Sequence, residues 1–157
     1  MTKDNKVLLI GGSGTLGSAI INSKIFKKLD APKKRELNLS SKKNIRKFLK
    51  KKYNLIINCA AIARMKECEK NLYKAIKVNV FGTLNLAEAI KEYQNKYKRK
   101  IKLIHISTDG VYSSKKGNYP ESSILKPYNN YGLTKMLAES AIKKIQTIAT
   151  NAQKIAA

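Results

Sequence analysis

A glycine-rich stretch near the amino terminus has the residue types and spacing of a phosphate-binding turn. Four apolar residues, Val7 to Ile10, predict a short strand buried on both faces, and Gly11, Gly14 and Gly17 follow it. At the start of a helix, backbone N–H groups can hold a phosphate, because the helix dipole is positive there and no Cβ obstructs the approach. Gly11 permits the turn, Gly14 lets the backbone close on a pyrophosphate, and Gly17 lets the helix pack on the strand. Glycine-rich turns after a strand also occur without any ligand, so the prediction of a phosphate-binding turn depends on the rest of the chain.

A second set of residues could deliver a proton to a carbonyl oxygen. Tyr131 and Lys135 stand four residues apart at a predicted helix start, so they share one face of the helix. A neighbouring ammonium stabilises a phenolate, so we expect Lys135 to lower the pKa of Tyr131 and make it a usable proton donor. Thr108 follows a predicted strand, where its hydroxyl could hold the same oxygen. A lone Tyr-x-x-x-Lys pair arises easily in a lysine-rich chain, but together with the glycine turn these residues indicate reduction by hydride transfer.

The elements that must position these residues alternate between strands and helices, which predicts a parallel α/β sheet. Besides the first strand, we expect a helix over Thr15 to Leu29, a weak strand over Asp30 to Lys34, a helix capped by Ser40 or Ser41 and running to Lys51, a strand over Asn54 to Ala61, a helix over Leu72 to Tyr93, a strand from Ile101 that ends in Ser107, Thr108 and Asp109, and a last helix beginning within Tyr128 to Lys135. Helical spacing groups Leu16, Ile20, Ile21 and Ile25 in the first helix, and makes Ala75, Val78, Asn79, Leu86 and Ala89 compatible with packing on the sheet.

Two of the predicted strands end in residues that bear on a dinucleotide cofactor. The second strand ends among Lys33, Lys34 and Arg35, and basic residues at this place accommodate a ribose 2′-phosphate. An acidic residue there would favour NAD, and Glu36 is the one contrary residue, so we predict NADP(H) before NAD(H). Small residues at a strand end, here Ala60 and Ala61, leave room for a cofactor or serve as tight core packing.

Composition limits the other classes of protein. The 157 residues predict one domain, and the 33 basic and 10 acidic residues give a net charge of +23. Only four of the basic residues are arginines, and the lysines are spread along every predicted helix, so we expect a solvated surface before a nucleic-acid partner. Cys59, Cys68 and His105 lack metal-ligand spacing, so we predict no metal and no disulfide, with His105 in the core or on a sheet face. The sequence has no membrane-length apolar run and no signal peptide, so we expect a cytoplasmic protein.

An ordered set of motifs resembles the extended short-chain dehydrogenase/reductase family, and most closely its dTDP-4-dehydrorhamnose reductase branch. The motifs are GGSGTLG, NCAA followed by CE, VNVFGTLNLAEA, ISTDGVY and YPESSILKPYNNYGLTKMLAE. The resemblance extends to about Glu139, and the order of the motifs is more specific than any one of them. It implies a Rossmann-like doubly wound parallel sheet, NADPH-dependent reduction of a 4-keto-6-deoxy sugar nucleotide in nucleotide-sugar biosynthesis, and a possible homodimer.

The resemblance also assigns roles to individual residues. Thr108, Tyr131 and Lys135 would form the catalytic trio, with Tyr131 and Lys135 also on the cofactor. Gly17 would complete a pyrophosphate site whose other members are Gly11, Ser13, Gly14, Thr15 and Leu16. Asn38 and Leu39 would lie by the adenine, and the ribose and nicotinamide side would be lined by Ala60, Ala61 and Ala63.

Departures from the family pattern bear on substrate fit and on turnover. Asn38 stands where relatives usually carry Asp, and Ser123 stands where an acidic residue is common. Relatives read Ser-Thr-Asp-Tyr-Val-Phe where this chain has Gly110 and Tyr112 in place of the Tyr and the Phe. Such enzymes continue beyond the Tyr-x-x-x-Lys helix into a smaller domain that grips the sugar nucleotide. We therefore expect residues 1–157 to be an NAD(P)-binding Rossmann domain without that substrate domain. The alternatives are a sugar-nucleotide epimerase or dehydratase, for which Asp109 beside Thr108 is suited, and a non-catalytic dinucleotide-binding module.

Overall fold

The computed structural model describes residues 6–113 and 117–155, and the chain divides into two compact units. Unit 1 comprises Met1–Ala60 and Asn85–Ile106, and unit 2 comprises Ala61–Leu84 and Ser107–Ala157. The glycine-rich stretch belongs to unit 1, whereas the predicted catalytic residues belong to unit 2. That residues 1–157 act as one NAD(P)-binding domain stays a prediction.

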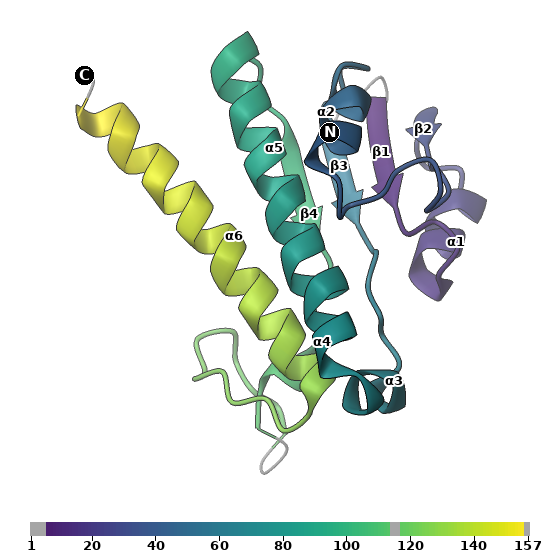
Figure 1. Ribbon diagram of the computed structural model, residues 1–157, viewed down its shortest axis with the longest axis vertical. Helices are drawn as coiled ribbons and strands as arrows, with labels where there is room; N and C mark the ends of the chain where they lie inside the picture. Colours follow the sequence, from purple (N-terminus) through teal and green to yellow (C-terminus); the bar gives the residue numbers. More distant parts are fainter. Residues whose placement is uncertain (1–5, 114–116, 156–157) are drawn as a thin grey trace. The chain divides into compact units, whose positions relative to one another are not determined.

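Unit 1 is built on a four-stranded parallel sheet with the strand order β2-β1-β3-β4 (Figure 1). The strands are β1 (Lys6–Ile10), β2 (Lys28–Asp30), β3 (Leu55–Asn58) and β4 (Lys102–His105). Because every neighbouring pair is parallel, the carboxyl ends of all the strands meet at one edge of the sheet. The sheet confirms the predicted parallel α/β fold class.

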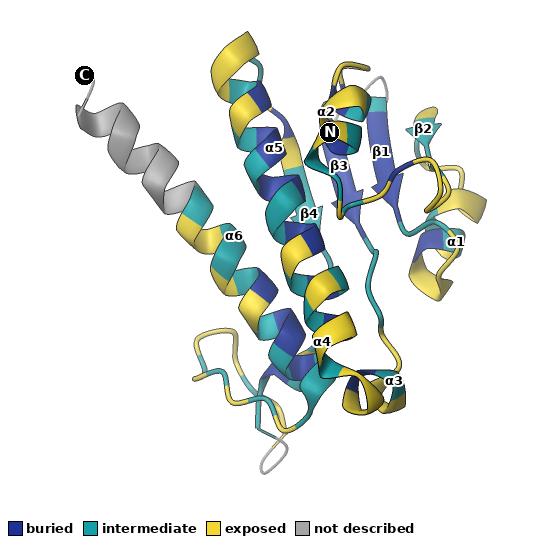
Figure 2. Cartoon of the chain, in the orientation of Figure 1, coloured by how far each residue is buried: buried dark blue, intermediate teal, exposed yellow. Residues whose placement is uncertain are grey.

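One face of the sheet is covered by α2 (Lys42–Leu49) and α5 (Gly82–Tyr97). The helices bury Ile45, Leu49, Leu86, Ala89 and Ile90 against Leu8, Ile10 and Ile56 of the sheet. Figure 2 shows the consequence, with β1 and β3 buried over most of their length. Ser41 caps α2 as predicted, since its side chain accepts from the Asn44 N–H at 3.2 Å.

The other face carries a smaller cluster of Val7, Leu9, Leu55 and Ile57. From α1 (Thr15–Asn22) Ile20 packs on this cluster, and Phe26 and Leu29 follow from the chain beyond the helix.

The predicted length of the first helix and the position of the second strand are wrong. The helix ends at Asn22 rather than Leu29, because Lys24 adopts a left-handed φ of +51° that turns the chain out of the helix. Strand β2 therefore forms at Lys28–Asp30 and not at Asp30 to Lys34. The expected apolar face of the helix is also wrong in part, since Leu16, Ile21 and Ile25 are exposed.

Unit 2 consists of short helices followed by one long helix. They are α3 (Met65–Lys70), α4 (Leu72–Ala75), a π-helical segment η1 (Ile76–Phe81), a 3₁₀ turn η2 (Asp109–Val111) and α6 (Asn130–Ile155). The predicted single helix over Leu72 to Tyr93 is thus interrupted by η1 and extended by α5 to Tyr97. A π-helix has a wider turn than an α-helix, so residues in η1 leave the spacing from which we predicted a sheet-facing side.

Three further predicted boundaries are too generous. The strand predicted over Asn54 to Ala61 is β3, at Leu55–Asn58. The strand predicted to begin at Ile101 and to end in Ser107, Thr108 and Asp109 is β4, which ends at His105. Helix α2 ends at Leu49, where Lys51 was predicted. The prediction that His105 lies in the sheet is confirmed, and its Nδ1 is 3.2 Å from Nδ2 of Asn58 on the neighbouring strand.

Cys59 and Cys68 do not form a disulfide. Across the described residues, no three or more His, Cys, Asp or Glu side chains gather in a way that could hold a metal ion. None of the described helices combines the length and apolar character required to cross a membrane.

A buried phenol ties β2 to the chain that enters β3. The Tyr53 hydroxyl donates to the Asp30 carboxylate at 2.6 Å, and Asp30 also pairs with Lys6 at 3.9 Å and Lys51 at 3.8 Å. Burial raises the pKa of Tyr53, and the hydrogen bond and negative charge of Asp30 raise it further. Tyr53 therefore keeps its proton in the folded chain at a pH where an exposed tyrosine loses it.

We expect Tyr53→Phe to lower the free energy of unfolding by about 1–2 kcal/mol near neutral pH, because a hydrogen bond to a charged acceptor is lost. In the unmodified chain, stability should fall as pH rises above about 10, because the unfolded tyrosine ionises there and the folded one does not. Urea unfolding between pH 7 and pH 11 measures both effects, with the exposed Tyr97→Phe as the matched control. An alkaline slope that is as steep in Tyr53→Phe as in Tyr97→Phe would contradict this assignment.

Candidate active site

The glycine turn joins β1 to α1 through two backbone contacts that leave no room for a side chain. Gly11 has a left-handed φ of +88°, and a Cβ on it would lie 2.7 Å from the Ala60 nitrogen at the end of β3. A Cβ on Gly17 would lie 2.2 Å from the Gly11 carbonyl oxygen. The turn is closed by a hydrogen bond from the Gly14 N–H to the Gly11 oxygen at 3.1 Å. These contacts place the start of α1 at the carboxyl edge of the sheet, beside Ala60.

The amino terminus of α1 suits an anionic ligand. Its cap residue, Gly14, has an extended backbone, makes no side-chain cap hydrogen bond, and no acidic residue occurs in the first turn. Ser13, Gly14, Thr15 and Leu16 are all exposed. A Cβ on Gly14 would meet only the Gly11 oxygen, at an ordinary 3.5 Å, so the fold itself does not require glycine there. Space at Gly14 together with the positive end of the helix fits a pyrophosphate group.

The basic residues expected to accept a 2′-phosphate lie beyond the second strand. Lys34 and Arg35 are exposed in a turn in which the Leu37 N–H donates to the Lys33 oxygen at 3.0 Å. The Glu36 carboxylate accepts from the Lys33 N–H at 2.7 Å, so it closes this turn. Because β2 ends early, its last residue is the acidic Asp30, whose carboxylate is engaged by Tyr53.

The residues expected near the adenine are held by local hydrogen bonds. The Asn38 side-chain oxygen accepts from the Ser40 N–H at 2.9 Å, and the Asn38 N–H donates to Asn44 at 2.7 Å. Leu39 is half-buried, and its carbonyl accepts from the Asn85 side chain at 2.9 Å. Unit 1 therefore brings Gly11 and Ala60 together, while Asn38 and Leu39 are placed by α2 and α5.

In unit 2, the segment after β4 meets the first turn of α6. The half-buried Thr108 hydroxyl accepts from the Gly110 N–H at 3.2 Å and donates to Asp109 at 3.1 Å. A Cβ on Gly132 would lie 2.1 Å from the Gly110 oxygen, so the backbone of α6 touches this segment. Tyr131 is half-buried and Lys135, one turn later, is buried. The unit thus places Thr108 and Tyr131 on two backbone segments in direct contact.

A second tie joins the same two segments. Ser107 donates a short hydrogen bond to Glu139 of α6. Glu139 stands one turn beyond Lys135, so this bond fixes the side of α6 that turns toward residues 107–110.

Asn79 was expected to face the sheet. It is instead buried in unit 2, where its side chain joins separate segments of the chain. Asn79 of η1 accepts from the Ile62 N–H at 2.7 Å and donates to the Ile62 oxygen at 3.1 Å. It also donates to the Thr134 hydroxyl at 2.9 Å, which in turn donates to the Tyr131 carbonyl at 2.8 Å. This chain of bonds fixes Ile62, between the predicted cofactor residues Ala61 and Ala63, relative to the backbone of Tyr131. The sequence signal was a polar residue within an apolar helix pattern.

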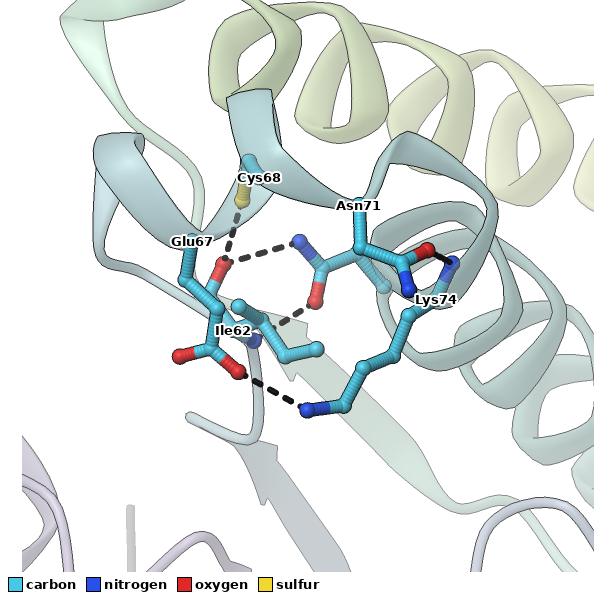
Figure 3. A network of polar contacts seen from close by, with 6 residues as sticks. Ile62, Glu67, Cys68, Asn71 and Lys74 are labelled. Atoms are coloured by element: carbon cyan, nitrogen blue, oxygen red, sulfur yellow. Dashed lines mark hydrogen bonds and ion pairs between the residues drawn. The ribbon is translucent and has the colours of Figure 1, made fainter.

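The Ile62 carbonyl also accepts from the Cys68 thiol at 3.3 Å. Figure 3 shows this cluster together with the neighbouring ion pair of Glu67 and Lys74, at 3.0 Å. Cys68 is fully buried, and burial together with the charges of Glu67 and Glu69 raises the pKa of its thiol.

The expected lowering of the Tyr131 pKa is wrong for this structure. Burial raises the pKa of the phenol, and electrostatic interactions with Cys68 and Asp109 raise it further. These effects outweigh an ammonium one turn away. The phenol therefore stays protonated at neutral pH, which suits a group that donates a proton.

A parallel sheet with a glycine turn after its first strand, and a later helix that begins with Tyr-x-x-x-Lys, define the class of extended short-chain dehydrogenases/reductases. The chain belongs to the family described as RmlD substrate binding domain, whose family model matches residues 5–152. The resemblance recognised in the sequence is confirmed.

Curated relatives include reductases of keto sugar nucleotides. A dTDP-4-keto-6-deoxy-D-glucose reductase of Streptomyces niveus is 30% identical in an alignment of 141 residues that covers 86% of this chain and 46% of that protein. A dTDP-4-dehydrorhamnose reductase of Aggregatibacter actinomycetemcomitans is 30% identical over 140 residues, with 85% of this chain and 45% of that protein covered. The chain spans about half the length of the curated relatives it matches.

Solved structures of similar sequence share the fold. A dTDP-4-dehydrorhamnose reductase of Clostridium acetobutylicum superposes with a TM-score of 0.76 at 30% identity, covering 89% of this chain and 49% of that one. The Bacillus anthracis reductase, solved in complex with NADP, gives a TM-score of 0.74 at 26% identity, with coverages of 90% and 50%.

Substitution by alanine should affect the stability of the chain very differently at Gly17 and at Gly14. Gly17→Ala forces a Cβ into the Gly11 carbonyl and should cost about 3 kcal/mol or more of stability. Gly14→Ala is compatible with an extended backbone and meets no close contact, so it should change stability by no more than about 1 kcal/mol. Urea unfolding of the two variants measures the difference. Equal stability of the two variants would contradict the packing role given to Gly17.

Proposed function

We propose that the chain binds NADP(H) and takes part in the reduction of a 4-keto-6-deoxy sugar nucleotide in nucleotide-sugar biosynthesis. The observation that carries this proposal is the glycine turn, which presents an uncapped helix start at the carboxyl edge of a parallel sheet. The named activities of the relatives support the substrate class, and the NADP bound by the Bacillus anthracis protein supports the cofactor.

Each group of predicted cofactor residues binds a different part of the cofactor in this proposal. Backbone N–H groups of the glycine turn, from Gly11 to Gly17 with Ser13, Thr15 and Leu16 exposed among them, hold the pyrophosphate. Lys34 and Arg35 hold the 2′-phosphate, since both are exposed and Glu36 is bound to its own turn. On the substrate side, Ala60, Ala61 and Ala63 leave space for the ribose and nicotinamide.

The residues of unit 2 serve the carbonyl. The cofactor, when bound, supplies a hydride to the carbonyl carbon. Thr108 turns its hydroxyl from Asp109 to the carbonyl oxygen and stabilises the negative charge that develops there. Tyr131 donates its proton to that oxygen, so that hydride and proton together convert the ketone to an alcohol. Lys135 then stabilises the phenolate that Tyr131 becomes.

A second candidate is a dehydratase or epimerase that regenerates its cofactor. Asp109 favours this alternative, because a carboxylate that accepts a hydrogen bond from Thr108 stands where a second acid or base could act. The two activities differ in stoichiometry, since only the reductase consumes NADPH.

The decisive assay follows NADPH oxidation by the purified chain with a dTDP-linked 4-keto-6-deoxy sugar. Tyr131→Phe should lower kcat by about a hundredfold to ten-thousandfold, the usual contribution of a positioned acid. The exposed Tyr128→Phe is the matched control and should retain the rate. Product without net NADPH consumption would favour the second candidate. Binding of NADPH without turnover, unaffected by Tyr131→Phe, would indicate a non-catalytic dinucleotide-binding module.

A further inference from the structure

The first residue of α6, Asn130, is bound by a carboxylate of α3, a helix that lies far away in the sequence. We call this two-point contact the grip of Glu69 on Asn130. Glu69 of α3 accepts from the Asn130 backbone N–H through Oε1 at 2.7 Å. Its other oxygen, Oε2, accepts from the Asn130 side-chain Nδ2 at 2.7 Å. Both oxygens of Glu69 are therefore used on the residue that immediately precedes Tyr131.

This grip has a strong physical basis. The first N–H groups of a helix have no partner within the helix, and a negative charge is stabilised by the positive end of the dipole. Hydrogen bonds to an ionised carboxylate are shorter and about twice as strong as neutral ones, and two parallel bonds also fix direction.

The residue before Asn130 is held by the same helix. The Asn129 side-chain oxygen accepts from the Gly132 N–H at 2.7 Å, as a cap of α6. Its Nδ2 lies 3.3 Å from the Met65 sulfur at the start of α3. Helix α3 thus contacts both residues that lead into Tyr131.

The other side of Tyr131 is already fixed. Its carbonyl accepts from Thr134, which Asn79 holds, and Gly132 abuts Gly110. On the amino side of Tyr131, the backbone is held through Asn130, which is bound by Glu69.

We propose that Glu69 is a positioning residue that fixes the direction of the Tyr131 phenol by its two-point grip on Asn130. This inference rests on the proposed role of Tyr131 as proton donor. Glu69 does not act on the substrate itself, and its effect passes through the backbone of Asn130.

The chain offers a matched control on the same helix. Glu67 carries the same charge two residues earlier in α3, and its carboxylate pairs with Lys74 at 3.0 Å. Glu67→Gln therefore removes an equal charge from α3 without removing the bonds to Asn130. A comparison of Glu69→Gln with Glu67→Gln separates the grip from the charge.

The experiment is NMR of the whole chain with ¹³Cζ-labelled tyrosine, in which Tyr131→Phe assigns the Tyr131 signal. Glu69→Gln should shift or broaden that signal and speed amide exchange at Asn130 about tenfold, because a charged acceptor becomes a neutral one. Glu67→Gln should change neither quantity. A Tyr131 signal unchanged in Glu69→Gln would overturn the proposal, even if the variant were less stable.

Two further arms keep the test decisive. Glu69→Asp keeps the charge, but its side chain is one methylene too short to bind both groups of Asn130. It should therefore move the Tyr131 signal in the same way as Glu69→Gln, and it replaces that variant in the test if Glu69→Gln does not fold. In the NADPH oxidation assay, Glu69→Gln should lower kcat about tenfold with an unchanged KM for NADPH, and a change in KM alone would contradict the proposal. If the unmodified chain shows no turnover, the proposed function fails, whereas the NMR arm still decides whether Glu69 orients Tyr131.

Discussion

The candidate site depends on backbone lying against backbone where no Cβ can fit. In unit 1, Gly11 meets Ala60 and Gly17 meets Gly11, so that β1, β3 and the start of α1 converge at one edge of the sheet. In unit 2, Gly132 meets Gly110, so that α6 touches the segment carrying Thr108. A side chain at Gly11, Gly17 or Gly132 would push these backbone segments apart and displace the polar groups that they carry.

Polar side chains complete what the glycines allow. Asn79 binds both polar groups of the Ile62 backbone and reaches Tyr131 through Thr134, while Glu69 binds Asn130. These groups are distributed over η1, α3 and α6, and the bonds from Asn79 to Thr134 and from Glu69 to Asn130 join segments that are far apart in the chain. Asn79 and Thr134 are buried, so losing the Asn79 side chain would leave buried polar groups without their partner, whereas the bonds between Glu69 and Asn130 lie in an exposed position.

The sequence was informative wherever a local feature decides the structure. Gly11, Gly14 and Gly17 follow a run of four apolar residues, and Ser41 precedes a basic amphipathic helix, so the turn and the cap could be predicted. The early end of α1 could not, because the left-handed residue is Lys24, a type that gives no such signal.

Long-range contacts account for the rest of what was missed. The place of Asn79 depends on a π-helical segment, and the grip of Glu69 spans 61 positions. The raised pKa of Tyr131 depends on burial and on Cys68 and Asp109, which precede it by many residues. Spacing along one helix identifies only Lys135 as a neighbour of Tyr131, and that neighbour alone would lower the pKa of Tyr131. The other surroundings of the phenol raise its pKa instead.

We propose that the backbone at Gly14 binds the phosphates of a dinucleotide. Titration of the chain and of Gly14→Ala with NADPH and NADH at moderate salt, followed by NADPH fluorescence and by thermal shift, tests it most directly. We expect saturable binding that prefers NADPH and is lost in Gly14→Ala while the variant stays folded. Equal binding by the two chains, or no binding of either nucleotide to the unmodified chain, would contradict it.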